Sequence, residues 1–147
     1  MTSDERGDYA GFGDRFVADF CDGLIALVIA LAVWFLIDRS ILGHETGFLD
    51  EEGPLSAADA ALWVWFLWNF TYLVGKTGQS WGRKLTGLKV VTSDGGPIGF
   101  WRSLGRNLFA AFVSAPLLYL GFLWVIWDPQ KQAWHDKVFR TYVLRNV

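Results

Sequence analysis

The sequence predicts an all-α integral membrane protein with two spanning helices, a third apolar segment broken by a proline, and a small cytoplasmic β element. Composition, segment length and strand propensity together predict this class. Hydrophobic residues make up 52% of the 147 residues, with nine tryptophans and twelve phenylalanines. Aromatic residues in this abundance suit a lipid-facing surface. A chain of this length is expected to form a single domain over residues 1–147.

The first apolar segment, Phe16–Ile37, is long enough to cross a bilayer. About 22 residues at about 1.5 Å each span about 33 Å as a helix. Residues 1–14 before it are polar and acidic, without the basic region of a signal peptide, and the segment shows no clear small-residue cleavage site. We therefore predict a cytoplasmic arm followed by a retained membrane anchor.

The second apolar segment, residues 57–75, begins at a recognisable start signal. Gly53 and Pro54 mark a turn. Ser56 and Asp59 follow with the spacing of a capping box, in which two side chains satisfy the first free N–H groups of a helix. We therefore predict a second spanning helix that starts next to Ser56.

The charges of the loops predict the orientation. Residues 38–55 hold one basic residue, Arg39, against five acidic ones. Cytoplasmic loops carry an excess of Lys and Arg, so residues 76–103 are predicted to be cytoplasmic, together with the N-terminus of a multi-pass inner-membrane protein. The basic residues of this loop are Lys76, Arg83, Lys84, Lys89 and Arg102.

The third apolar segment, residues 104–127, is interrupted by Pro116, and proline bends or breaks a helix because it lacks a backbone donor. Each half, about 11 residues or about 17 Å, is too short to span alone. A single crossing would also place the basic tail, residues 128–147, outside the cell, against the positive-inside rule. We favour a re-entrant hairpin that keeps the tail cytoplasmic; a kinked single span is the alternative.

Two short segments have strand character. Leu88–Thr92 precedes the turn residues Ser93–Gly96, and Val138–Leu144 is rich in Val, Phe, Thr and Tyr. Isolated strands beside a membrane need partners. If these two strands pair, both lie on the same side of the membrane, which again favours a third segment that returns.

Three charged residues at the start of the first span form the main candidate site. At about 100° per residue, Asp19 lies about 40° from Arg15 around a helix and Asp22 about 20° to the other side. Ionisable groups at this depth normally face a protein interior or a wet cavity. One interpretation is an ion pathway with Asp22 as ligand, Asp19 as helper and Arg15 tuning the charge. The other is an ion pair that fixes helix position or subunit packing.

Five further residues complete the predicted site. For Asn69, we favour an interhelical hydrogen bond over a transport role. Arg106 is expected to pair with Asp136 or Asp22. Arg83 and Lys84 are expected to face anionic lipid headgroups, because the glycines around them lack the spacing of a phosphate-binding loop.

The composition argues against several function classes. A formal net charge of −2 does not favour nucleic-acid binding. Two distant histidines and one cysteine make no convincing zinc set, and no Ser–His–Asp or Cys–His arrangement has sequence support. We expect no enzyme activity, no catalytic residue, no bound metal and no cofactor.

Several motifs along the chain resemble the RDD family of small bacterial membrane proteins. They cover about residues 9–145, and two positions depart from the family pattern: Ser80 replaces the usual threonine and Arg83 the usual lysine. In chain order, the motifs are Arg15 with Asp22, Gly78–Val91, Asp94-Gly95, Arg106-Asn107, and Trp134-His135-Asp136 with Thr141 and Val143.

The resemblance implies a transport function, because the family has been suggested to move small ligands or cations, and some members are linked to sodium or lithium export. We therefore expect a transporter of small cations that exchanges or conducts sodium, lithium or protons. So few helices hardly enclose a pathway alone, so we expect a homo-oligomer in the lipid bilayer. The alternative is a non-transporting scaffold or accessory subunit that binds a partner protein or anionic lipid.

Overall fold

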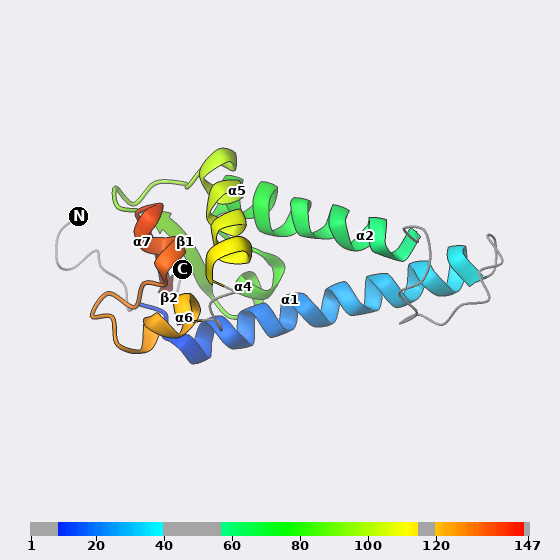
Figure 1. Cartoon of the computed structure of the whole chain (residues 1–147), viewed down its shortest axis with the longest axis horizontal. Helices are drawn as coiled ribbons and strands as arrows, with labels where there is room; N and C mark the ends of the chain where they lie inside the picture. The colour runs from blue at the N-terminus through cyan, green and yellow to red at the C-terminus, as the bar shows by residue number, and fades with distance from the viewer. Residues whose placement is uncertain (1–8, 40–56, 115–119, 146–147) are drawn as a thin grey trace.

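In the computed structural model, which describes residues 9–39, 57–114 and 120–145, two long helical rods lie side by side and the other elements gather at one end (Figure 1). The first rod is α1 (Phe12–Val33), continued by the π-helical η1 (Trp34–Arg39). The second rod comprises α2 (Ala57–Phe66), the π-helical η2 (Leu67–Leu73) and α3 (Val74–Thr77). The predicted fold class is confirmed in its coarse form: the protein is mostly helical, with one long apolar N-terminal helix and a small antiparallel sheet.

The first rod is largely uncovered. It begins at Phe12, four residues before the predicted Phe16, because the Asp14 carboxylate accepts a hydrogen bond of 2.8 Å from the Gly11 N–H and supports the first turn. Within the described part of the chain, Phe12–Ile37 is the one helix long and apolar enough to cross a membrane. Only 11% of its most apolar stretch is buried inside the protein, whereas an apolar helix in a soluble core would be mostly buried.

The second rod covers the predicted residues 57–75 and continues to Thr77. Gly78 ends it with a φ of +80°, a left-handed conformation that glycine adopts readily. A Cβ at Gly78 would lie 2.4 Å from the carbonyl oxygen of Val90, so the close approach of the following chain also requires glycine. The predicted capping residue Ser56 and the acidic loop before it lie outside the described residues.

The remaining elements form what we call the end lobe. Its first strand matches the predicted Leu88–Thr92 residue for residue. Its second strand begins at Thr141 instead of the predicted Val138, because the Asp136 carboxylate accepts a hydrogen bond of 3.2 Å from the Ala133 N–H and opens a short helix there. In chain order the lobe comprises α4 (Trp81–Leu85), β1 (Leu88–Thr92), α5 (Phe100–Phe109), η3 (Ala110–Ser114), α6 (Leu120–Leu123), η4 (Trp124–Ile126), α7 (Trp134–Val138) and β2 (Thr141–Arg145).

The two predicted strands do pair: β1 and β2 are antiparallel neighbours, with Val90 opposite Val143. The arm before α1 joins the other edge of β2, where Tyr9 bridges Leu144. Because β1 and β2 are neighbours, the chain between them, which includes the third apolar segment, returns to the sheet that it left. The two arms of this segment, η3 and α6, contact each other; Pro116, the predicted break between them, lies outside the described residues.

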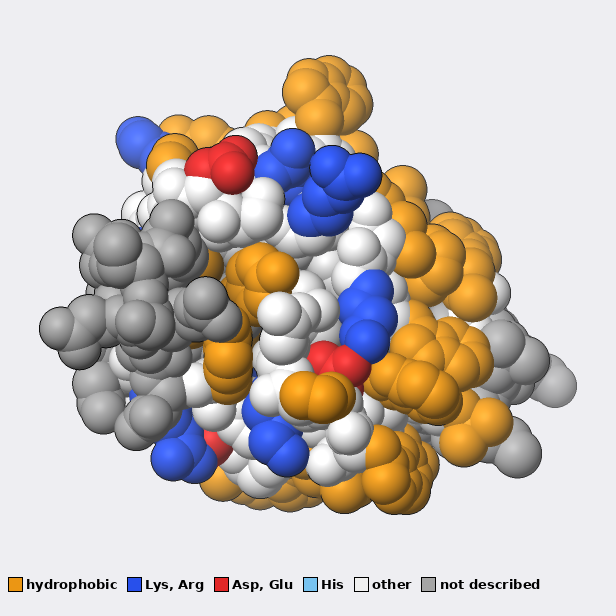
Figure 2. Space-filling view, turned by 90° about the vertical axis from the view of Figure 1, so that its left-hand side faces the viewer, with side chains coloured by type: hydrophobic (Ala, Val, Ile, Leu, Met, Phe, Trp, Pro, Cys, Tyr) orange, Lys and Arg blue, Asp and Glu red, His pale blue; other side chains and the backbone are white. Residues whose placement is uncertain are grey.

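The core sits in the end lobe, where the start of α1, α3 and the sheet meet. Seen from this end, Lys and Arg side chains are spread over the surface with few acidic ones, and apolar side chains gather mostly on the right-hand side of the view, with smaller groups in the middle (Figure 2). The end lobe therefore presents a polar, mainly basic face at one end of two apolar rods. The buried core residues are Ala10, Ala18, Val74, Leu88, Val90, Ile98 and Val143.

Candidate functional site

One buried ion cluster of the end lobe is built around Asp136, whose side chain is fully buried. Arg15 Nη1 donates to Asp136 Oδ2 at 2.5 Å, and Arg106 Nε donates to Oδ1 at 2.8 Å. Thr141 Oγ1 also donates to Oδ1, at 3.2 Å. One carboxylate thereby joins α1, α5, α7 and β2, and Arg106 has one of the two partners expected for it.

The charge states in this cluster follow from burial and from the neighbouring cations. Burial by itself raises the pKa of Asp136, but Arg106 and Arg15 outweigh it and hold this pKa well below its usual range. Burial lowers the pKa of His135 to about 3, so the imidazole is neutral near pH 7.

His135 has one ring nitrogen inside the ion cluster and one without a partner. Nε2 lies 3.4 Å from the donor Arg106 Nη2 and 3.5 Å from the acceptor Asp136 Oδ1, so its contacts fit either neutral tautomer. His135 Nδ1 is buried and has no hydrogen-bond partner. The cluster therefore contains one buried ring nitrogen that no described residue uses.

A second buried carboxylate, Asp22, is held by neutral donors. It accepts hydrogen bonds from Asn69 Nδ2 at 2.8 Å, Ser80 Oγ at 2.5 Å and the Gly82 N–H at 2.7 Å. Among the described residues, no ion pair involves Asp22. Asn69 Oδ1 also accepts from the Trp81 N–H at 3.0 Å. Asp22 thus ties α1 to η2 and α4, and the interhelical hydrogen bond predicted for Asn69 is present.

The contact of α1 with α4 depends on Gly82. A Cβ at this position would lie 2.0 Å from the carbonyl oxygen of Ala18 and 2.9 Å from the Asp22 carboxylate. No larger residue fits unless the helices separate. Ser80 completes the contact, because its Oγ caps α4 by accepting from the Arg83 N–H at 3.3 Å while it donates to Asp22.

The predicted stripe of Arg15, Asp19 and Asp22 separates into three environments. Arg15 bonds to Asp136 at the base of the lobe, and Asp22 is enclosed by the start of α4. Asp19 is half-exposed and lies 3.4 Å from Nη2 of Arg83. A shared helix face therefore does not give these residues a shared role, because α7 and α4 contact α1 at different levels.

Arg83 and Lys84 also separate, although both were predicted to face headgroups. The Lys84 side chain is exposed, with Nζ 5.1 Å from the centre of the Trp81 ring. The Arg83 side chain is only 9% exposed, and its Nε has no hydrogen-bond partner. The prediction of a surface position is wrong for Arg83, because successive residues of a helix point about 100° apart and α4 turns this one towards α1.

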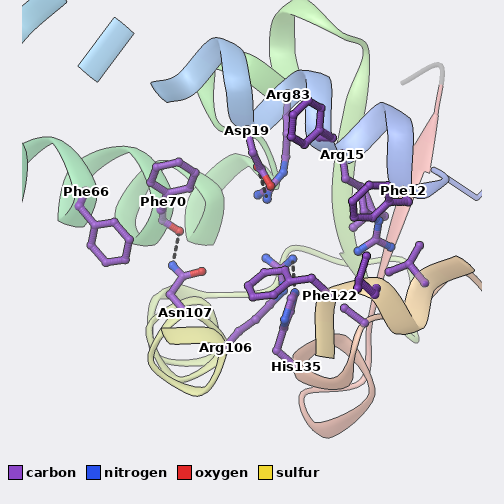
Figure 3. A pocket seen from close by; sticks show the side chains of 15 residues that line it. Phe12, Arg15, Asp19, Phe66, Phe70, Arg83, Arg106, Asn107, Phe122 and His135 are labelled. Carbon is purple, nitrogen blue, oxygen red and sulfur yellow. Dashed lines mark hydrogen bonds and ion pairs between the residues drawn. The ribbon is translucent and has the colours of Figure 1, made fainter. Parts of the chain in front are cut away.

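A cavity of about 510 Å³ lies beside both clusters, between α1 with η2 and the group α5, α6 and α7 (Figure 3). Arg15, Arg83 and Arg106 all line it and reach it from different walls. Burial lowers the pKa of Arg83, Asp19 opposes this shift, and the nearby Arg106 lowers the pKa further, so like charges repel across this space. Five phenylalanines complete much of the apolar lining: Phe12, Phe16, Phe66, Phe70 and Phe122.

The wall between α5 and η2 is fixed by the carbonyl oxygen of Phe70. Ser103 Oγ donates to it at 2.9 Å and Asn107 Nδ2 at 2.8 Å. Helical carbonyls are open to such outside donors where the regular α-helical ladder is interrupted, as in the π-helical η2. These bonds hold α5, and with it Arg106, against the second rod.

Sequence reasoning did not identify Ser80, Gly82 and Thr141 as partners of the two carboxylates. A serine before a short helix is a recognisable cap signal, but Asp22 lies 58 residues from Ser80, and no local pattern encodes that contact. Within the ranges that the structure describes, no three His, Cys, Asp or Glu side chains are grouped to hold a metal ion. What the site offers is two satisfied carboxylates and a cavity rich in arginine.

The site joins the two ends of the sequence, because Arg15 and Asp22 in α1 and Asp136 in α7 all hold the same lobe together. The profile described as the RDD family matches residues 9–140 of the chain. The chain belongs to the RDD family. In this RDD chain, the arginine and both aspartates that carry the resemblance are hydrogen-bonded parts of the end lobe.

Relatives of this RDD chain occur in mycobacteria and in Bacillus. A proline-rich antigen homolog of Mycobacterium tuberculosis (strain H37Rv) is 38% identical over 149 residues, which cover 90% of this chain and 62% of the relative. The proline-rich antigen of Mycobacterium leprae is 40% identical over 82 residues, 55% of this chain and 32% of the relative. The chain therefore spans less than two thirds of either mycobacterial relative. The uncharacterized protein YxaI of Bacillus subtilis is 27% identical over 147 residues, 92% of this chain and 96% of YxaI. No solved structure matches the chain.

Proposed function

We propose that this RDD chain is a multi-pass inner-membrane protein that acts as a ligand-binding module at the cytoplasmic side of the bilayer. The observation that carries the proposal is the cavity of about 510 Å³, where three guanidinium groups and five phenyl rings surround one space. Pockets that combine an apolar lining with a few convergent polar groups are the usual form of a ligand site.

The two rods are proposed to span the membrane as a hairpin. The first rod is apolar and uncovered, and α2 lies beside it over much of its length. Large apolar side chains on both rods face outward, among them Val28 at 66% exposure and Trp63 at 64%. Lipid would remove this surface from water, which stabilises the arrangement. The basic end lobe then lies in the cytoplasm by the positive-inside rule.

The third apolar segment is proposed to lie at the cytoplasmic interface without crossing. Its arms α5–η3 and α6–η4 contact each other through η3 and α6, and the strands on either side of it pair. The exposed rings of Phe112 and Trp127 suit an interfacial position, where aromatic side chains gather. This arrangement supports the re-entrant hairpin over the kinked single span.

The apolar composition of the two rods fits a binding role better than ion conduction through a single copy. Residues 23–37 of the first rod are glycine, aliphatic and aromatic, and residues 60–68 of the second contain Ala, Leu, Val, Phe and Trp. A charged solute needs polar groups along its path through a bilayer. These two described stretches of a single copy offer none, whereas a binding site at one end needs none.

Cation transport by a homo-oligomer is the second candidate function. Two observations favour it: Asp22 is a fully buried carboxylate without an ion-pair partner among the described residues, and Asp19 is a half-exposed carboxylate at the cavity. Pairing between copies would then have to supply the polar path that one copy lacks. The same Asp22, however, has three hydrogen-bond donors around it, which a cation would displace.

Reconstitution separates the two functions. The full chain is placed in liposomes, and sodium, lithium and proton flux are compared with empty liposomes. Flux that Asp22→Asn or Asp19→Asn abolishes, and that the exposed control Asp94→Asn preserves, would establish the second candidate. We expect no flux, together with a melting temperature in detergent that rises with at least one anionic, cationic or zwitterionic ligand. A melting temperature that no ligand class changes would reject the binding module.

A further inference from the structure

We propose that the cavity binds an anionic amphiphile, with its phosphate or carboxylate head between the arginines and its hydrocarbon chain along the phenylalanines. This inference rests on the ligand-binding function proposed above and names the chemical class of the ligand. The arginines that line the cavity, the incomplete pairing of Arg83 and the apolar lining each contribute to it.

Most of the charged side chains that reach the cavity are positive. Arg15, Arg83 and Arg106 line it, together with the half-exposed Asp19. Two fully buried carboxylates stand behind them: Asp136, shared by Arg15 and Arg106, and Asp22, which acts electrostatically on Arg83. The three carboxylates balance the three arginines in formal charge, but both buried ones are already hydrogen-bonded, so the charges open to a ligand are the arginines and Asp19. An anion among them would relieve the repulsion among the guanidinium groups.

Arg83 is the residue whose position a bound anion explains. Its side chain is 91% buried, yet its single ion-pair contact among the described residues is with Asp19 at 3.4 Å. Its Nε is buried without a hydrogen-bond partner. A buried cation is costly unless it is paired and hydrogen-bonded. Arginine also presents a planar fork of donors that matches a phosphate or carboxylate.

His135 adds a second buried nitrogen without a partner beside the cavity. Its side chain is 6% exposed and lines the cavity, and its Nδ1 is buried without a hydrogen-bond partner. Arg83 and His135 are thus two lining residues whose polar atoms are incompletely paired within the described structure.

The apolar lining favours an amphiphile over a small soluble anion. Five phenylalanines face the cavity, and two of them, Phe12 and Phe16, continue onto the outer surface of the first rod, where they are 37% and 60% exposed. Phe66 and Phe70 lie on the opposite side, along η2 and the end of α2 (Figure 3). A free phosphate would contact the arginines and leave these rings uncovered, whereas a hydrocarbon chain would cover them.

The test uses the full chain purified in a mild detergent. Phosphatidylglycerol, phosphatidylcholine and inorganic phosphate are added separately. The melting temperature is measured, and native mass spectrometry counts the lipid molecules retained by each chain. We expect phosphatidylglycerol to raise the melting temperature and one molecule per chain to be retained. Phosphatidylcholine and inorganic phosphate are expected to do neither.

Two neighbouring substitutions locate the site. Arg83→Gln should lower the affinity for phosphatidylglycerol about tenfold to a hundredfold, the loss expected for one buried charge-assisted contact. Lys84→Gln, on the exposed side of the same helix, should change the affinity by less than about twofold. Without lipid, Arg83→Gln should melt at the same temperature as the unmodified protein or higher, because it removes an incompletely paired buried cation. Loss of lipid binding at unchanged stability cannot come from misfolding.

Each alternative outcome overturns a specific part of the inference. Equal binding of phosphatidylcholine would overturn the requirement for negative charge, and an equal effect of inorganic phosphate would overturn the amphiphile. Unchanged lipid affinity in Arg83→Gln would overturn the assignment to this cavity. Stabilisation by sodium or tetraphenylphosphonium, but not by phosphatidylglycerol, would overturn the inference and leave the ligand-binding function standing. Only the absence of any ligand effect would reject that function as well.

Discussion

Asp22 offers the sharpest test of whether the buried carboxylates of the end lobe hold the structure together. Three donors converge on it: Asn69 Nδ2 at 2.8 Å, Ser80 Oγ at 2.5 Å and the Gly82 N–H at 2.7 Å. All three lie outside α1, so the carboxylate is the link between this helix and two other segments. We compare Asp22→Ala, which removes the acceptor, with Asp22→Asn, which keeps its shape.

The geometry predicts very different costs for the two variants. Alanine leaves three buried donors without a partner at about 1 to 3 kcal/mol each. Since the Ser80 hydroxyl can rotate and water can enter from the cavity, we expect a total near the lower end, about 3 to 5 kcal/mol. In Asp22→Asn, the amide oxygen can still accept from Asn69 and Gly82, and its NH₂ can donate to the Ser80 oxygen. Only the charge is lost, so we expect about 1 kcal/mol.

The free energy of unfolding is measured in mixed detergent micelles for both variants and the unmodified protein. The reasoning requires a large loss for alanine and a small loss for asparagine. If the free energy of unfolding of Asp22→Ala is within about 1 kcal/mol of the value for the unmodified protein, the carboxylate is not a structural link. Loss of cation flux in a stable Asp22→Asn variant would then favour the second candidate function.

Three further predictions concern the packing at Gly82, the pH dependence of stability and the buried carboxylate of Asp136. Gly82→Ala should lower the free energy of unfolding by about 3 kcal/mol or more, because the new Cβ would lie 2.0 Å from a backbone oxygen of α1. The matched control is Gly23→Ala, whose Cβ would have nothing within 4 Å and which should leave the free energy of unfolding unchanged or raise it. The pKa of His135 falls from 6.5 to about 3 on folding, so acid protonates the unfolded chain first and stability falls as the pH drops below 6.5. The expected slope is about 1.4 kcal/mol per pH unit, and urea or detergent unfolding at pH 6.5 and pH 5 should show it in the unmodified protein but not in His135→Gln. Arg106→Gln leaves the buried Asp136 with one cation fewer and should lower the free energy of unfolding by about 3 kcal/mol. A loss below about 1 kcal/mol would contradict the stabilising role of the ion cluster.

Much of the fold could be predicted because it depends on local patterns. The long apolar run of the first rod, the second rod and the strand Leu88–Thr92 each follow from composition and propensity within a few residues. The boundaries that shifted did so because side chains capped the helices. Asp14 moved the start of α1 earlier, and Asp136 turned residues predicted as strand into α7.

The site was predictable in its membership more than in its geometry. Arg15, Asp22, Asn69, Arg106 and Asp136 all take part in buried or half-buried hydrogen bonds, as their polarity beside apolar segments suggested. Their partners were not predictable, because helical spacing grouped Arg15 with Asp22, whereas α7 approaches one and α4 the other. The roles in transport assigned to these residues stay predictions.

By itself, the sequence determined that this chain forms apolar helices with a small strand pair, and it carried the motifs of the RDD family. Such features depend on neighbours a few positions apart, so they are written locally. The tertiary structure alone decided that Arg15 meets Asp136, 121 residues away, and that Arg83 turns inward to a cavity lined with phenylalanines. These contacts form between segments distant in the chain, and their stability comes from burial and charge that arise only when those segments meet.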